Sequence, residues 1–177
     1  GDIFVVRVAG NIAGPSEVGS IEYGAGHLHT PLLVILGHSH CGAVTAAAQN
    51  AKTHGSIPAI LNQIKPAVAK VKAKDPKAEG DDLVSKAIKA NVLLTMENIF
   101  RKSPEIRELV RDGHLQVVGG ISDLRTGQIT WLGQLPNQCV LLYADEAAAS
   151  KSKSAEHAPA AKSKSVDHAP ATKAEPR

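Results

Sequence analysis

Short apolar runs alternate with stretches of helical periodicity along most of this chain. Residues 3–8 are rich in β-branched side chains, and they predict a strand that ends in the tight loop Ala9-Gly10-Asn11. Residues 32–36 are continuously apolar, which is typical of a strand buried on both faces of a parallel sheet. Two more strands are predicted at 115–121 and 128–132, and the turn between them favours a hairpin.

Helices are expected between these strands. Ser16 is expected to cap the first of them, and Ser103 with Pro104 is expected to open the last, which Gly113 ends. The expected helices are, in order, about 16–28, a segment that begins at 42, a segment that begins near 58, 82–101 and 104–112. Strands that alternate with helices and end in a hairpin predict an α/β fold, with a mainly parallel central sheet, flanking helices and an antiparallel edge strand.

The end of the chain differs from the rest in composition. KSKSAEHAPAA at 151–161 is followed by KSKSVDHAPAT at 162–172, an 11-residue repeat with almost no side chain to bury. We therefore predict one domain over residues 1–150 and a disordered low-complexity tail over 151–177.

The charge of the chain belongs to this tail. Lys and Arg number 20 and Asp and Glu number 17, for a net charge of +3; the last 27 residues hold 6 of the basic and 3 of the acidic residues, and the first 150 are neutral. Aromatic residues make up only 3% of the chain, so a base-stacking surface is not expected. No apolar run approaches the 18 residues or so of a membrane span. Neither nucleic acid nor a membrane is expected as a partner.

Candidate chemistry lies where the apolar strand 32–36 ends. Gly37-His38-Ser39-His40-Cys41-Gly42 joins this strand to a predicted helix, and ligands of open α/β sheets bind at the carboxyl ends of strands. His38 and Cys41 are three residues apart, so one turn can direct both toward one metal ion. Imidazole with thiolate favours zinc. His40 is either an exposed loop residue or a group that supports a ligand or relays protons.

Two residues are too few for a catalytic zinc site. The further candidates have no motif around them, and Cys139 is expected to be a small buried core residue. These candidates are Cys139, Asp2, Asp123 and the remaining histidines. Two cysteines are too few for a disulfide framework; the alternatives are a single disulfide and, as we expect, two free thiols in a reducing compartment.

Several segments together resemble the β-class carbonic anhydrases. They are GDIFVVRVAGN, GSIEYGAGHL, TPLLVILGHSHCGAVTAA, HGSIPAILNQIKPAV, AIKANV and VVGGISDLRTGQITWLG, in the family's order over about residues 1–134. The resemblance implies the fold of that family and zinc-dependent, reversible hydration of carbon dioxide to bicarbonate. It implies His38 and Cys41 as metal ligands, a substrate pocket shaped by Gly10, Asn11 and Gly42, and a homodimer or higher even-numbered oligomer.

One motif of the family matches no position here. The upstream Cys-x-Asp-x-Arg motif would supply another zinc ligand and a catalytic Asp/Arg pair, so no catalytic residue is assigned. We interpret the chain as N-terminally truncated and expect it to be inactive alone. The alternatives are a carbonyl sulfide or carbon disulfide hydrolase on the same fold, and a non-catalytic oligomerising module. A soluble protein of the cytoplasm or the periplasm is expected.

Overall fold

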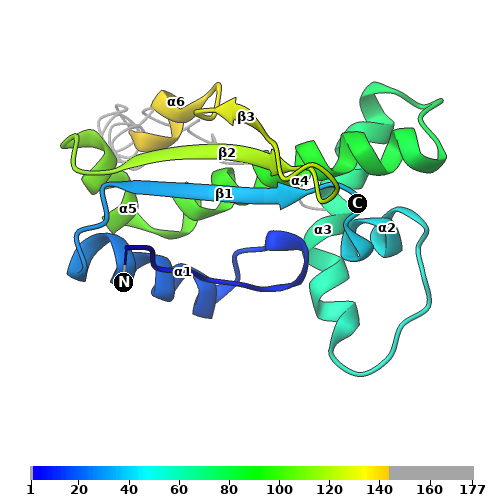
Figure 1. Ribbon diagram of the computed structural model, residues 1–177, viewed down its shortest axis with the longest axis horizontal. Coiled ribbons are helices and arrows are strands. Elements are labelled where there is room, and N and C mark those ends of the chain that lie inside the picture. Colours follow the sequence, from blue (N-terminus) through cyan, green and yellow to red (C-terminus); the bar gives the residue numbers. More distant parts are fainter. Residues whose placement is uncertain (1, 144–177) are drawn as a thin grey trace, which may run out of the picture. The chain divides into compact units, whose positions relative to one another are not determined.

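The sheet within residues 2–143, the part that the computed structural model describes, has three strands (Figure 1). β1 (Leu32–His38) pairs in parallel with β2 (Gln116–Ser122), in a register that runs from Leu32 opposite Gln116 to His38 opposite Ser122. β2 pairs in antiparallel fashion with β3 (Ile129–Gly133). The strand order β1-β2-β3 confirms the expected antiparallel edge strand.

Helices occupy most of the remaining described chain. Two short helical segments are labelled η1 and η2, and the last helix, α6, was not expected from the sequence. The bounds are η1 (Ala9–Asn11), α1 (Pro15–Glu22), η2 (Tyr23–His27), α2 (Gly42–Ala48), α3 (Ile57–Lys74), α4 (Gly80–Lys102), α5 (Pro104–Arg111) and α6 (Gln138–Leu142).

The helix starts follow from local chemistry. α5 begins at Pro104, which confirms the helix start expected at Ser103-Pro104, and Ser103 Oγ accepts a hydrogen bond from the Ile106 N–H at 3.1 Å. The expectation that Ser16 caps α1 is wrong, because the helix begins at Pro15 after Gly14. There the Glu17 carboxylate accepts from the Gly14 N–H at 2.9 Å, so a side chain from within the first turn satisfies this donor instead.

The long helix α4 packs against both β1 and β2 and lies behind the sheet in Figure 1. Val92, Met96, Ile99 and Phe100 on this helix are fully buried. The N-terminal half of α4 also packs against α3, where buried aliphatic side chains form a second cluster. The burial of these apolar side chains is the main contribution that stabilises the packing of α4 against the sheet.

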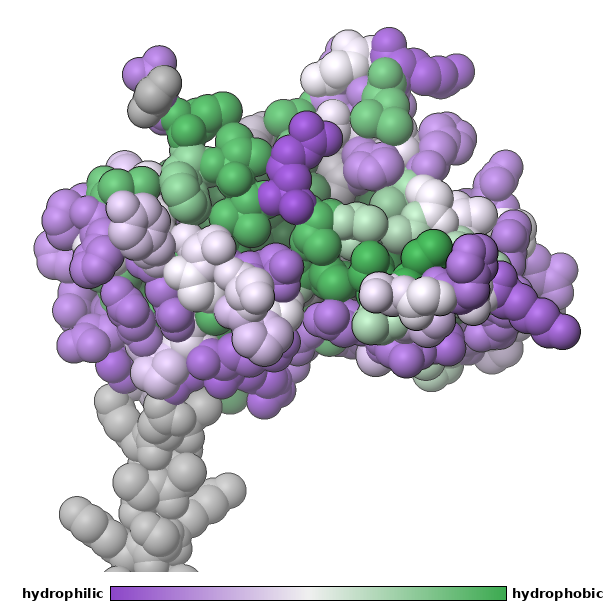
Figure 2. All heavy atoms as spheres, turned by 90° about the horizontal axis from the view of Figure 1, so that it is seen from below, coloured by the Kyte–Doolittle hydropathy of each residue, from purple (hydrophilic) through white to green (hydrophobic). Residues whose placement is uncertain are grey.

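Residues 2–8 do not form the predicted strand. They pair with no strand of the described chain, and Ile3 and Val5 are 81% and 59% exposed. The expectation that β1 is buried on both faces is also wrong, since Leu32 and Leu36 are 49% and 42% exposed. β-branched residues favour a strand only where a neighbouring strand is present to pair with. The face seen from below in Figure 2 carries a broad apolar band.

Within the described residues, no helix is both long and apolar enough to cross a membrane. The predicted tail, residues 151–177, lies outside the described part of the chain.

Candidate metal-binding site

The turn that carries the two candidate ligands links β1 directly to α2. His38 is the last residue of β1, and Cys41 immediately precedes α2. Between them, His40 has a φ of +53°, and this left-handed conformation reverses the chain within a few residues. Both predicted ligands therefore stand on one tight turn, His38 half-buried and Cys41 only 4% exposed.

Ser39 fixes this turn to the rest of the sheet. Its N–H donates to the Ser122 carbonyl oxygen at 2.8 Å, which extends the β1–β2 ladder by one bond. Its hydroxyl oxygen accepts from the Leu124 N–H at 3.0 Å. The turn is thus held by the end of β2 and by the hairpin that follows it.

The hydrogen bond of His38 determines which ring nitrogen is available. Nδ1 lies 2.9 Å from the Ser39 carbonyl oxygen. Because a carbonyl oxygen only accepts, Nδ1 must carry the proton in this contact, and in the neutral ring the lone pair is then on Nε2. Such a backbone contact is the usual way in which a metal-binding histidine is oriented.

Cys41 has a free thiol and a backbone carbonyl that accepts two hydrogen bonds. Its carbonyl oxygen accepts from the Thr45 N–H at 2.9 Å and from the Thr45 hydroxyl at 3.0 Å. These bonds belong to the first turn of α2. They fix the backbone of Cys41 while its sulfur forms no disulfide.

The Gly10–Asn11 turn contacts β1, α2 and α4. Gly10 has a φ of +71° and Asn11 a φ of +42°, so two consecutive residues adopt the left-handed conformation. A Cβ atom at Gly10 would lie 2.5 Å from Ile64 Cδ1 and 3.3 Å from Ala43 Cβ. The positive φ and this close packing both favour glycine at this position. Gly42, by contrast, is exposed and has open space where its Cβ would lie.

Within residues 2–143, none of the other candidate ligands joins His38 and Cys41. Asp123 Oδ1 accepts from the Arg125 N–H at 2.8 Å and the Thr126 N–H at 3.0 Å, and the bonds from Thr126 and Arg125 lower the pKa of this carboxyl group. Asp2 and His40 are exposed. Cys139 is exposed on α6, so its assignment to the core is wrong. Among the described residues, no group of three or more His, Cys, Asp or Glu is placed to hold a metal ion.

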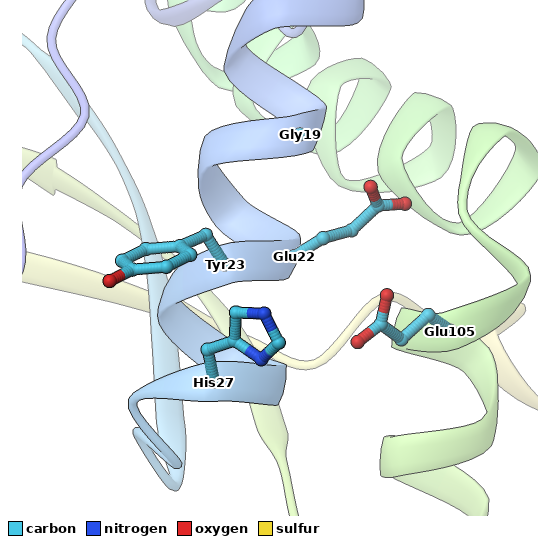
Figure 3. Close-up of a pocket in the computed structure, with 5 residues that line it drawn as sticks. All are labelled: Gly19, Glu22, Tyr23, His27 and Glu105. Atoms are coloured by element: carbon cyan, nitrogen blue, oxygen red, sulfur yellow. The ribbon is translucent and has the colours of Figure 1, made fainter.

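A separate hollow of about 270 Å³ lies between α1, η2 and α5. Figure 3 shows the Glu22 and Glu105 carboxylates and the His27 ring facing this space. Tyr23 stacks edge-on against His27, with ring centroids 5.3 Å apart. None of the predicted site residues lines it.

Comparison with known proteins gives the family. Residues 1–129 match the family described as carbonic anhydrase. The chain belongs to the carbonic anhydrase family. Carbonic anhydrase 2 of Mycobacterium tuberculosis is 33% identical over 133 residues, which cover 72% of this chain and 61% of that protein. A carbonic anhydrase of Synechococcus elongatus is 31% identical over 138 residues, 73% of this chain and 50% of that protein. The chain thus spans between half and two thirds of these relatives.

Solved structures place this chain in the β class of the family. The β-carbonic anhydrase CcaA matches with a TM-score of 0.63 and 25% identity, over 74% of this chain and 66% of that one. A structure from a study of two tetrameric β-carbonic anhydrases of the ascomycete Sordaria macrospora matches with a TM-score of 0.67 and 27% identity, over 74% and 68%. The fold and the family expected from the sequence are confirmed.

Two residues near the candidate site were not predicted from the sequence. Ser39 lies inside the candidate motif, but a serine in a loop has no distinguishing pattern. Asn91 is 1% exposed on α4 and hydrogen-bonds to the Gly10–Asn11 turn. Its signal was present: it is a polar residue on the otherwise apolar face of a predicted helix.

Proposed function

We propose that this chain takes part in the zinc-dependent, reversible hydration of carbon dioxide to bicarbonate, with His38 and Cys41 as two of the zinc ligands. The observation that carries the proposal is the geometry of their turn. The turn lies at the carboxyl end of a strand and contains His40 in the left-handed conformation. On one side of it is the half-buried imidazole of His38, whose Nδ1 is hydrogen-bonded to a backbone carbonyl. On the other side is the buried free thiol of Cys41.

The donor set fits zinc in type but is incomplete in number. Imidazole nitrogen and thiolate sulfur are common zinc ligands, and zinc takes four. Since the described residues hold no third donor grouped with these two, we place the remaining ligands outside residues 2–143. On this proposal the chain alone binds zinc weakly and does not hydrate carbon dioxide.

The residues around the turn have distinct roles in this proposal. Bound zinc would supply a Lewis acid that makes water nucleophilic near neutral pH. His38 would donate its Nε2 lone pair, and the Ser39 carbonyl would keep the ring in that tautomer. Gly10, Asn11 and Gly42 would shape the substrate pocket.

We also propose a homodimer or a higher even-numbered oligomer. The related proteins from Sordaria macrospora are tetrameric. The exposed apolar side chains of Ile3, Val5, Leu32 and Leu36 are of the kind that subunit association covers.

Zinc titration against a competing chelator tests the metal assignment. The background is Cys139→Ser, because the exposed Cys139 thiol can bind metal independently. We expect His38→Ala and Cys41→Ser each to weaken zinc binding strongly and His40→Ala to leave it unchanged. Equal zinc affinity in Cys41→Ser and its parent would overturn the proposal.

A further inference from the structure

A buried hydrogen-bond pair connects α4 to the turn beside the proposed site. Asn91 Nδ2 donates to the Gly10 carbonyl oxygen at 2.7 Å and to Asn11 Oδ1 at 3.3 Å. Because the Gly10 carbonyl only accepts, the orientation of the Asn91 amide is fixed. Both N–H donors of one buried side chain are therefore directed at one turn.

The Asn91–Asn11 pair does more than fill space in the core, because it leaves two buried polar atoms of the described chain without partners. Asn91 Oδ1 and Asn11 Nδ2 are buried and have no hydrogen-bond partner in the described structure. A buried polar atom without a partner lowers stability, and an apolar side chain at position 91 would avoid that loss. Such departures concentrate where the structure holds a functional segment in a set conformation.

The Gly10–Asn11 turn has an unfavourable backbone conformation and a long backbone hydrogen bond to close it. Gly10 and Asn11 both have positive φ, and the hydrogen bond that closes the turn, from the Asn11 N–H to the Val8 carbonyl, is 3.2 Å long. A non-glycine residue in this conformation is disfavoured by its own Cβ. The amide of Asn91 supplies the interaction that offsets this preference.

The same part of α4 reaches the strand end that carries His38. A Cβ at Gly37 would lie 2.7 Å from Val92 Cγ2, 3.5 Å from Ile88 Cγ2 and 3.8 Å from Asn11 Oδ1. Gly37 therefore packs against α4 and the Gly10–Asn11 turn at once. A shift of the turn would be transmitted to the residue that precedes His38.

We propose that Asn91 is a positioning residue, which holds the Gly10–Asn11 turn against the end of β1 and so sets the geometry of the pocket and of His38. The inference rests on the proposed function for the role of His38 and the pocket. The contact between Asn91 and the turn is independent of it.

The first test needs no metal. Hydrogen exchange is followed at the amides of residues 9–12 and 38–42 in the 177-residue chain. We expect Asn91→Leu, which fills the space without donors, to speed exchange in residues 9–12 about tenfold, as the loss of one hydrogen bond would. Asn91→Asp, which keeps the shape but lacks both N–H donors, should act in the same direction. Thr95→Val, a buried polar-to-apolar change one turn further along α4, is the matched control and should leave residues 9–12 unchanged.

The second test uses cobalt(II) as the probe in the Cys139→Ser background, with the thiolate-to-cobalt absorption band as its signature. We expect Asn91→Leu to weaken cobalt binding about tenfold, the low end of the effect of residues that orient ligands, and Thr95→Val to have no effect. Unchanged exchange at residues 9–12 in both Asn91 variants would overturn the inference. So would cobalt binding equal to that of the parent, when Cys41→Ser abolishes the band. If Cys41→Ser keeps the band, the proposed function fails, and the exchange result decides the inference alone.

Discussion

Leu124 donates its backbone N–H to the Ser39 hydroxyl oxygen at 3.0 Å, and this bond joins the hairpin turn to the turn that carries both proposed zinc ligands. The two residues are 85 positions apart in the sequence. Because Ser39 also donates to the Ser122 carbonyl, a single residue between His38 and His40 connects the site to the end of β2 and to the start of the β2–β3 turn.

Ser39→Ala should loosen this connection. Leu124 would lose its acceptor, and we expect the free energy of unfolding to fall by about 0.5–1.5 kcal/mol. Chemical denaturation measures the loss, and Ser16→Ala, at an exposed serine of α1, is the control. A loss no larger than that of Ser16→Ala would show that the hydroxyl does not stabilise the turn.

Replacement by alanine should lower stability clearly at Gly10 and change it little at Gly42. At Gly10, the positive φ alone should lower the free energy of unfolding by about 1–2 kcal/mol, and the contact with Ile64 Cδ1 should add to it. At Gly42 the new methyl group meets open space, so stability should change by less than about 1 kcal/mol. Thermal melts compare the two variants, and equal destabilisation would contradict the packing described for Gly10.

The ionisation of Asp123 should make the thermal stability of the chain depend on pH in the acid range. The N–H groups of Thr126 and Arg125 hold the pKa of Asp123 below its ordinary value of 3.8. A group with a lowered pKa stabilises the folded state above its unfolded pKa, and the contribution disappears as the pH falls through the folded pKa. Asp123→Asn should therefore have a lower melting temperature than the parent at pH 7.

The difference between Asp123→Asn and its parent should stay constant down to about pH 5 and shrink as the pH falls below the ordinary value of 3.8. Asp2→Asn, at an exposed residue outside the hairpin, is the control and should show no such difference. A gap that persists unchanged at pH 2 would mean that the charge of Asp123 does not stabilise the hairpin.

The exposed apolar residues should drive self-association. Val5 is 59% exposed within residues 2–8. If it lies in a subunit contact, Val5→Lys should weaken association about tenfold, because burying a valine contributes roughly 1.5 kcal/mol or more. Light scattering at several concentrations measures the effect, and Val140→Lys on α6, at a residue that is 68% exposed, should have none. Equal association in both variants would place the contact elsewhere.

The elements that the sequence predicted well are those whose signals are local. The apolar run of β1, the turn of the β2–β3 hairpin and the helix start at Ser103-Pro104 each depend on residues within a few positions. The turn from His38 to Cys41 was found for the same reason, since both candidate ligands and the flanking glycines lie in one segment.

The features that the sequence did not predict depend on residues that are distant in sequence but neighbouring in space. Residues 3–8 have strand-forming side chains but no strand to pair with in the described chain, and Cys139 has an apolar neighbourhood in sequence but an exposed one in space. Asn91 reaches Gly10 across 81 positions. Pattern alone does not specify which turn a buried amide will hold.

X-ray absorption at the zinc edge tests the central claim most directly, because it identifies the atoms bound to the metal. In the zinc-loaded 177-residue chain with Cys139→Ser, we predict one sulfur neighbour at about 2.3 Å and a nitrogen neighbour at about 2.0 Å. Cys41→Ser should remove the sulfur signal, and His38→Ala should reduce the imidazole signal, while His40→Ala should change neither. A sulfur signal that persists in Cys41→Ser, or zinc bound without sulfur in the parent, would contradict the assignment of His38 and Cys41 as ligands.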